Sequence, residues 1–135
     1  MDILFIAGDI TTRDLLTQMF HPRQAKITYA PNLQQGLRLA RQADFSLSIL
    51  DDGNFQSETI RFCQEFRRLN GIPLLVLSAQ DDPNRIATIL DAGADYYLVK
   101  PVPRAILEAT INTLLRRCQP SQPLITSWGD HVSML

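Results

Sequence analysis

The sequence predicts an α/β domain in which a five-stranded parallel sheet is covered by helices on both faces. Short apolar runs alternate five times with segments of helical spacing along the 135-residue chain. The runs are continuously apolar, which is typical of strands that are buried on both faces of a parallel sheet. Polar residues directly follow several runs, and the carboxyl ends of parallel strands meet at one edge of the sheet, where ligands bind.

Five apolar runs are the expected strands. The first, at 3–6, is short, and the run at 47–50 leads into the turn-rich cluster 51–54. In the second run, Ile27 and Tyr29 fall on one face, as alternate residues of a strand do. The expected strands cover 3–6, 26–30, 47–50, 73–77 and 96–99.

Segments with helical spacing separate these runs. Leu33 and Leu37 lie one turn apart, which indicates the buried face of a helix. The Asp-Pro pair at 82–83 is typical of a helix start, because proline fits the first turn. Basic pairs at 67–68 and 116–117 suit helix ends, and we expect them to be solvated. The expected helices cover 14–20, 32–43, 57–69, 82–91 and 103–117.

Composition excludes several classes of protein. The net charge of −1 provides no basic field for nucleic acid or an anionic membrane. The apolar N-terminus at 1–6 is short and has no basic residues, so it reads as a strand and not as a signal peptide. No apolar stretch has the length that spans a membrane. Cys63 and Cys118 fit no metal or redox spacing, so we expect plain thiols and a cytoplasmic location.

An acid, a hydroxyl and an ammonium are expected to converge at the carboxyl edge of the sheet. Asp51, Ser78 and Lys100 each follow an apolar run. The compact ammonium of a lysine suits a phosphate or a carboxylate. In the alternative interpretation, Asp51 and Lys100 form a buried ion pair, Ser78 caps a strand and Tyr97 is a core aromatic residue.

Four segments carry a resemblance to a known family. They cover 3–6, 47–51, 73–79 and 91–101, and the last is the most specific. Through them, residues 3–117 resemble a response-regulator receiver domain of two-component signalling. The resemblance implies a flavodoxin-like (βα)5 fold with strand order 2-1-3-4-5.

The resemblance also assigns roles to the residues at the carboxyl edge. Asp51 matches the phosphoacceptor, and Lys100 matches the lysine that pairs with it or with the phosphoryl oxygens. Ser78 matches the switch hydroxyl, and Tyr97 the aromatic residue that changes rotamer with it. The bond between Lys100 and Pro101 is expected to be cis.

The chain departs from the family where magnesium binds. The two acids that hold Mg²⁺ in the family fall on Ala7 and Gly8, which have no ligand atoms in their side chains. We therefore expect magnesium binding to be weak or absent, with no other cofactor. Phosphoryl transfer then lacks the metal that neutralises its developing charge. Asp9, Asp51 and the backbone carbonyl of Gly53 are weak candidates for ligands.

Further departures surround the acceptor. Asp52 occupies a position that is apolar in the family, and is another candidate for a metal-ligating oxygen. Phe55 stands where the family usually has proline, and Thr59 where glycine is usual. These residues indicate an atypical receiver.

The C-terminal part of the chain has a different composition. Residues 1–117 are expected to form the receiver domain, and the proline-containing segment 118–123 to be a linker. The tail at 124–135 resembles the start of the winged-helix effector domain of OmpR-type regulators. We expect this tail to be the beginning of a truncated DNA-binding domain.

Two hypotheses of function follow. In the first, the chain is an atypical receiver domain of a transcriptional response regulator, and it acts largely independently of phosphorylation because Ala7 and Gly8 replace the acids. In the alternative, a histidine kinase phosphorylates Asp51 and so switches a conventional receiver. Under both hypotheses we expect the chain not to be an enzyme. An electron carrier of the flavodoxin type is disfavoured, because no glycine-rich or hydroxyl-rich loop follows the first strand.

The expected partners are a regulatory protein or a sensor histidine kinase, and a second copy of the chain. A homodimer would use the fourth helix, the fifth strand and the last helix. Thr110 and Asn112 stand where the family tends to place arginines on that face, while Asp95 is kept, so dimerisation through salt bridges is in doubt. DNA contact is expected only through the missing C-terminal domain, and no membrane contact is expected.

Overall fold

The computed structural model describes residues 1–20, 25–53 and 57–117, in which five strands alternate with five helices. The strands are β1 (Asp2–Ala7), β2 (Lys26–Ala30), β3 (Leu47–Asp52), β4 (Leu74–Ser78) and β5 (Tyr96–Val99). The helices are α1 (Ile10–Phe20), α2 (Leu33–Gln42), α3 (Ser57–Leu69), α4 (Pro83–Ala92) and α5 (Arg104–Arg117). Phe55, Cys118, the expected linker and the tail lie outside the described residues.

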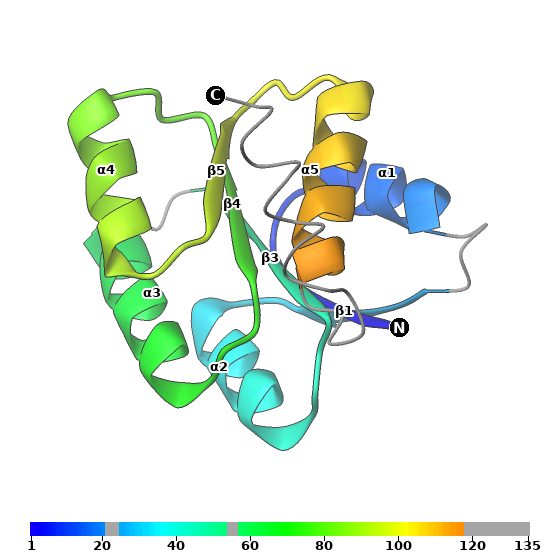
Figure 1. Cartoon of the computed structure of the whole chain (residues 1–135), viewed down its shortest axis with the longest axis horizontal. Helices are drawn as coiled ribbons and strands as arrows, with labels where there is room; N and C mark the ends of the chain where they lie inside the picture. The colour runs from blue at the N-terminus through cyan, green and yellow to red at the C-terminus, as the bar shows by residue number, and fades with distance from the viewer. Residues whose placement is uncertain (21–24, 54–56, 118–135) are drawn as a thin grey trace, which may run out of the picture.

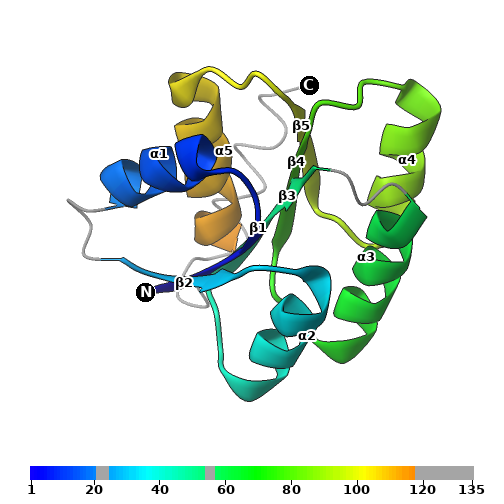
Figure 2. The same cartoon turned by 180° about the vertical axis from the view of Figure 1, so that it is seen from behind.

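The strands form one parallel sheet in the order β2-β1-β3-β4-β5, which confirms the predicted topology. Helices α1 and α5 cover one face of the sheet, and α2, α3 and α4 cover the other (Figures 1 and 2). All strands run in the same direction, so the loops after β1, β3, β4 and β5 meet at one edge. None of the helices within the described ranges is both long and apolar enough to cross a bilayer.

The core consists of two apolar layers, one on each face of the sheet. Ile3 and Phe5 of β1 pack under α1 and α5, whereas Leu4 and Ile6 pack under the other three helices. Successive side chains of a strand point to opposite faces, so both faces of β1 are fully buried. This arrangement explains why the strands read as continuous apolar runs.

Helix α1 begins at Ile10, so the expectation of a helix over 14–20 placed its start one turn too late. The reason is an N-cap at Asp9. Its Oδ1 accepts a hydrogen bond from the backbone N–H of Thr12 at 2.7 Å, and its carbonyl accepts from the N–H of Arg13. The other elements begin and end within two residues of the predicted positions.

Arg67 was expected to be a solvated helix end, and this prediction is wrong. Its guanidinium donates hydrogen bonds to the carbonyl of Gly93 at 2.8 and 3.1 Å and to the carbonyl of Ile72 at 3.2 Å. It also pairs with Asp95 Oδ2 at 2.7 Å. That oxygen in turn accepts from the N–H of Leu74. Arg67 therefore joins the end of α3 to the loops before β4 and β5.

The adjacent arginine provides a matched comparison. Arg68 has an exposed side chain, and among the described residues its guanidinium pairs with Glu65, one turn earlier. We expect Arg67→Ala to lower the free energy of unfolding by about 1–3 kcal/mol, because several carbonyls lose a charged donor. Arg68→Ala should change it by less than about 0.5 kcal/mol. Urea denaturation of both variants tests this, and equal midpoints would contradict it.

Candidate functional site

The structure brings the predicted polar residues to the carboxyl edge of the sheet. Asp51 lies at the end of β3 with only 1% of its surface exposed. Lys100 follows β5, and its backbone N–H donates to the carbonyl of Ser78 at 2.8 Å. The Lys100–Pro101 bond is cis, as the resemblance predicted. These contacts bring the lysine side chain across the ends of the strands toward Asp51.

Both carboxylate oxygens of Asp51 have partners within the domain. The ammonium of Lys100 forms an ion pair with Oδ1. The backbone N–H of Asp9 donates to Oδ2 at 3.2 Å. A buried carboxylate is costly without such partners, so the pair with Lys100 stabilises the sheet edge.

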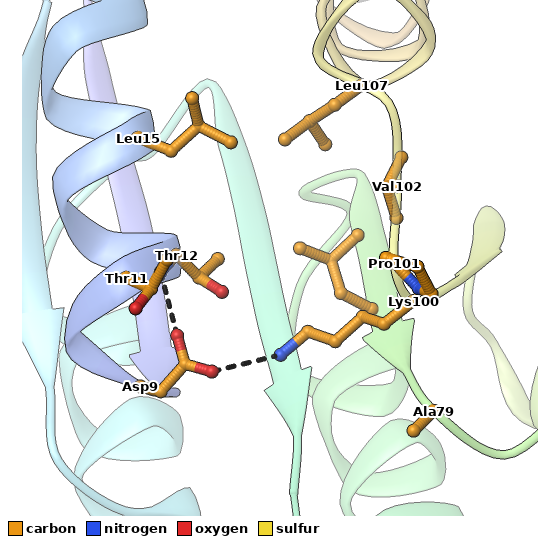
Figure 3. Close-up of a pocket in the computed structure, with 10 residues that line it drawn as sticks. Asp9, Thr11, Thr12, Leu15, Ala79, Lys100, Pro101, Val102 and Leu107 are labelled. Carbon is orange, nitrogen blue, oxygen red and sulfur yellow. Dashed lines mark hydrogen bonds and ion pairs between the residues drawn. The ribbon is translucent and has the colours of Figure 1, made fainter.

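Asp9 forms the exposed side of this cluster. Its Oδ2 lies 3.7 Å from the Lys100 ammonium (Figure 3). Lys100 also pairs with Asp51, so one lysine faces two carboxylates. Hydrogen bonds from Thr12, above all from its backbone N–H, and the nearby Lys100 charge hold the pKa of Asp9 below its usual value. Asp9 is therefore a carboxylate at neutral pH.

The loop at Ala7 and Gly8 has a shape that excludes a side chain at Gly8. Both residues have positive φ angles, 59° and 96°. A Cβ atom on Gly8 would lie 2.5 Å from Phe5 Cζ and 2.8 Å from Asp51 Oδ2. Only glycine adopts this backbone without cost, and the space is already filled. The position thus lacks a carboxylate and also has no room for one.

Asp52 lies on the opposite face of β3 from Asp51 and belongs to a buried polar network. Its Oδ1 accepts a hydrogen bond from the hydroxyl of Thr59 at 2.6 Å. Its Oδ2 pairs with the Arg85 guanidinium of α4 at 3.1 Å. Asp52 and Thr59 are 3% and 0% exposed, so the network lies inside the α3–α4 side of the core.

This network explains two departures from the family at once. Asp52 and Thr59 each looked anomalous in the sequence, and in the fold they are partners. The oxygens of Asp52 face α3 and α4, so they are turned away from Asp51 and do not supply a metal site beside it. Sequence reasoning missed Arg85, because 33 positions separate it from Asp52 and only the fold joins them.

Ser78 and Tyr97 both bind the same loop residue. The N–H of Gln80 donates to Ser78 Oγ at 3.1 Å, and the hydroxyl of Tyr97 donates to the Gln80 carbonyl at 2.7 Å. Ser78 is completely buried and Tyr97 is 9% exposed. The loop after β4 is therefore held on both sides by buried side chains.

Cys63 lies at the centre of α3 and is a buried free thiol. Burial raises its pKa to about 12, and the charge of Asp52 acts in the same direction. The thiolate is the reactive form of cysteine, so this residue is unreactive at neutral pH.

Comparison with known proteins identifies the family. Residues 3–112 match the family described as the response regulator receiver domain. This chain belongs to that family. Among the curated relatives of this receiver domain is the transcriptional regulatory protein AfsQ1 of Streptomyces coelicolor. It is 29% identical over 130 residues, which cover 96% of this chain and 58% of the relative.

A second curated relative is also a transcriptional regulatory protein. The KDP operon transcriptional regulatory protein KdpE of Escherichia coli is 32% identical over 116 residues, which cover 86% of this chain and 52% of the relative. The receiver domain thus spans about half the length of these curated relatives.

Solved structures confirm the fold of the receiver domain. A two-component response regulator from Clostridium difficile has a TM-score of 0.77 at 24% identity and covers 86% of this chain and 96% of its own. A structure described as an atypical orphan response regulator with a phosphorylation-independent regulatory mechanism has a TM-score of 0.74 at 20% identity. Its alignment covers 86% of this chain and 96% of its own.

The residues present do not fit magnesium, the cation that the family implies. Ala7 and Gly8 offer no side-chain oxygen, and the oxygens of Asp51 face Lys100 and the N–H of Asp9. Mg²⁺ requires near-octahedral oxygen ligands and is usually held by one or two carboxylates, whereas here the Lys100 ammonium lies against both Asp9 and Asp51. Within the described ranges, no three or more His, Cys, Asp and Glu side chains are grouped to hold a metal ion.

Proposed function

We propose that this chain is the receiver half of a transcriptional regulator and that it acts largely without phosphorylation of Asp51. The curated relatives are transcriptional regulators, and DNA would be bound by a domain outside the described residues. The signal would come from a protein partner or another ligand. The alternative is a conventional receiver that a sensor histidine kinase phosphorylates. A cytoplasmic location is part of both proposals.

The observation that carries the proposal is the closed environment of Asp51. A phosphoacceptor must present a free carboxylate oxygen to phosphorus, while a metal neutralises the charge on the phosphoryl group. Here Lys100 and the Asp9 N–H engage the two oxygens, and Phe5 and Asp51 leave no room at Gly8 for one of the two metal-binding acids. A phosphate approaching this site would meet the carboxylates of Asp9 and Asp51 with only one ammonium between them.

The loop after β4 supports the same proposal. Ser78 and Tyr97 would report phosphorylation by rearranging around a phosphoryl group. Their hydroxyls instead take part in hydrogen bonds with Gln80, and Arg85 joins the following helix α4 to β3. One conformation of the α4 region is thus stabilised by contacts inside the protein. A partner that binds this conformation needs no chemical step at Asp51.

Intact-mass spectrometry tests the proposal directly. With phosphoramidate and millimolar Mg²⁺, we expect less than about a tenth of the chains to gain a phosphoryl group, because the charge-neutralising metal is missing. A conventional receiver domain that carries the acidic pair, treated in parallel, is the positive control. Stoichiometric labelling that disappears in Asp51→Asn would overturn the proposal and establish the conventional switch.

We also propose that a homodimer forms through α4, β5 and α5, but with apolar contacts in place of salt bridges. Leu90, Tyr96, Val99 and Ile106 on these elements are between 38% and 51% exposed. Two polar residues of this surface make their contacts within the domain. Thr110 is 8% exposed and donates to the carbonyl of Ile106, and Asp95 pairs with Arg67.

Sedimentation velocity over a range of concentrations tests the dimer. We expect Tyr96→Glu to weaken self-association by roughly tenfold or more, since a charge then enters an apolar contact. Ile10→Glu is the control, because Ile10 is an exposed apolar residue of α1, which is not one of the three interface elements. Equal effects of both substitutions, or a wild-type chain that stays monomeric, would exclude this interface.

A further inference from the structure

A cavity of about 410 Å³ lies beside the Asp51 cluster, between the N-terminal halves of α1 and α5. Asp9 and Lys100 face each other at one end, and Leu15 and Leu107 face each other at the other (Figure 3). Leu77 of β4 also lines the cavity. The site is therefore polar at one end and apolar along its length, and its volume is in the range of small-molecule pockets.

The cavity exists because α1 packs on the sheet mainly through its second half. Leu16, Met19 and Phe20 are buried, whereas Thr11 is exposed and Leu15 only half-buried. Helices α1 and α5 approach each other less closely than α3 and α4 do on the other face. The first turns of the two helices consequently leave a gap above β4.

The charges at the polar end select the head group of a ligand. Lys100 is paired with the buried Asp51, so its charge is already used. Asp9 Oδ1 accepts from the N–H of Thr12 at 2.7 Å, whereas within the described part of the chain Asp9 Oδ2 has only the long 3.7 Å contact with Lys100. This oxygen has room for a further donor, and two carboxylates against one ammonium disfavour an anion.

We propose that this cavity binds a small amphipathic ammonium compound. Its amine would contact Asp9 Oδ2, and its apolar body would lie against Leu15, Val102 and Leu107. The proposal that the cavity binds this compound does not depend on the proposed function. The proposal that the compound is the signal that replaces phosphorylation rests on the proposed function. The two are separable, because the mass-spectrometric labelling of Asp51 reports nothing about binding in this cavity.

Three probes with the same phenyl ring and different head groups test the proposal on the full chain. Amide shifts of the ¹⁵N-labelled protein are followed by NMR during titration with 2-phenylethylamine, 2-phenylethanol and 3-phenylpropanoate. We expect saturable shifts at Thr12, Val102 and Leu107 with the amine. The alcohol should bind roughly three- to fivefold more weakly and the carboxylate at least tenfold more weakly. Equal or tighter binding of the carboxylate would overturn the proposal, as would shifts confined to other parts of the domain or no saturation at millimolar amine.

Substitutions then separate the head-group contact from the apolar contact. Asp9→Asn keeps an oxygen that caps Thr12 but removes the charge, so amine binding should fall to the level of the alcohol while alcohol binding stays unchanged. Asp14→Asn removes an exposed charge from the same helix outside the cavity and should change nothing. Amine binding that is insensitive to Asp9→Asn, or equally sensitive to Asp14→Asn, would refute the assigned contact.

Filling the cavity supplies an independent arm. Val102→Phe, at a half-buried position on the wall, should abolish binding of all three probes. If Val102→Phe lowers the thermal midpoint, Ala79→Phe replaces it in the test. Ala79 is an exposed residue of the cavity wall, and its substitution should also abolish binding of all three probes. Undiminished binding in a folded variant would show that the probes bind elsewhere.

Discussion

Replacing Arg85 by alanine is expected to lower the free energy of unfolding by about 3–5 kcal/mol, the cost of leaving a buried carboxylate without its cation. Asp52 is 3% exposed, and of its contacts with Thr59 and Arg85 only the hydrogen bond from the Thr59 hydroxyl would remain after the substitution. Equilibrium denaturation in urea measures the loss. Arg61→Ala, on the exposed surface of α3, is the matched control and should change stability by less than about 0.5 kcal/mol.

A compensating variant tests whether the loss comes from the unpaired charge. In the triple substitution Asp52→Leu, Thr59→Val and Arg85→Met, apolar groups of similar size replace the whole network. Such replacements are often neutral or stabilising, so most of the stability lost in Arg85→Ala should return. A triple variant as unstable as Arg85→Ala would show that the network contributes more than mutual neutralisation.

Introducing an acid at position 8 is the second substitution with a large expected effect. Gly8→Asp should destabilise the fold by about 2–5 kcal/mol, because it combines a strained positive φ with overpacking against Phe5 and a new charge beside Asp51. Thermal or urea denaturation measures the loss. We expect no gain in Mg²⁺ binding, because the displaced Asp51 no longer presents its oxygens toward the loop.

Two further glycine substitutions separate the causes. Gly8→Ala should retain most of the loss, since Cβ alone makes the close contacts. Gly71→Asp should be nearly neutral, because a Cβ there meets nothing within 4 Å and the backbone has no positive φ. If Gly8→Asp proved as harmless as Gly71→Asp, the loop would have to rearrange readily, and a metal site could then be restored.

The sequence predicted the sheet and its order because buried strands and helix boundaries leave local signals. Continuous apolar runs, Asp82 with Pro83, and the lysine before Pro101 are each read from neighbouring residues. The site was only partly predictable. Asp51 and Lys100 could be placed at one edge, but the N-cap at Asp9 and the positive φ of Gly8 depend on how the loop after β1 turns.

Contacts between distant segments left no signal that a single sequence reveals. Arg67 and Arg68 look alike in the sequence, yet one binds the carbonyls of two loops and the other is solvated. The difference arises because the fold brings the loops before β4 and β5 to Arg67 and not to Arg68, which no local pattern encodes. The pairing of Asp52 with Arg85 is similar, since the unusual acid was visible and its partner was not.

The Asp52, Thr59 and Arg85 network also limits the order in which these positions can change during evolution. Removing the arginine first leaves a charge inside the protein, and removing the acid first takes away the carboxylate that both the Thr59 hydroxyl and the Arg85 guanidinium contact. Both of these first steps away from the present trio are therefore expected to pass through a less stable protein, although we expect the apolar end point to be no worse. In a lineage that has acquired the three polar residues, this loss of stability alone would keep them in place. It would do so even without selection for binding of a partner protein at α4.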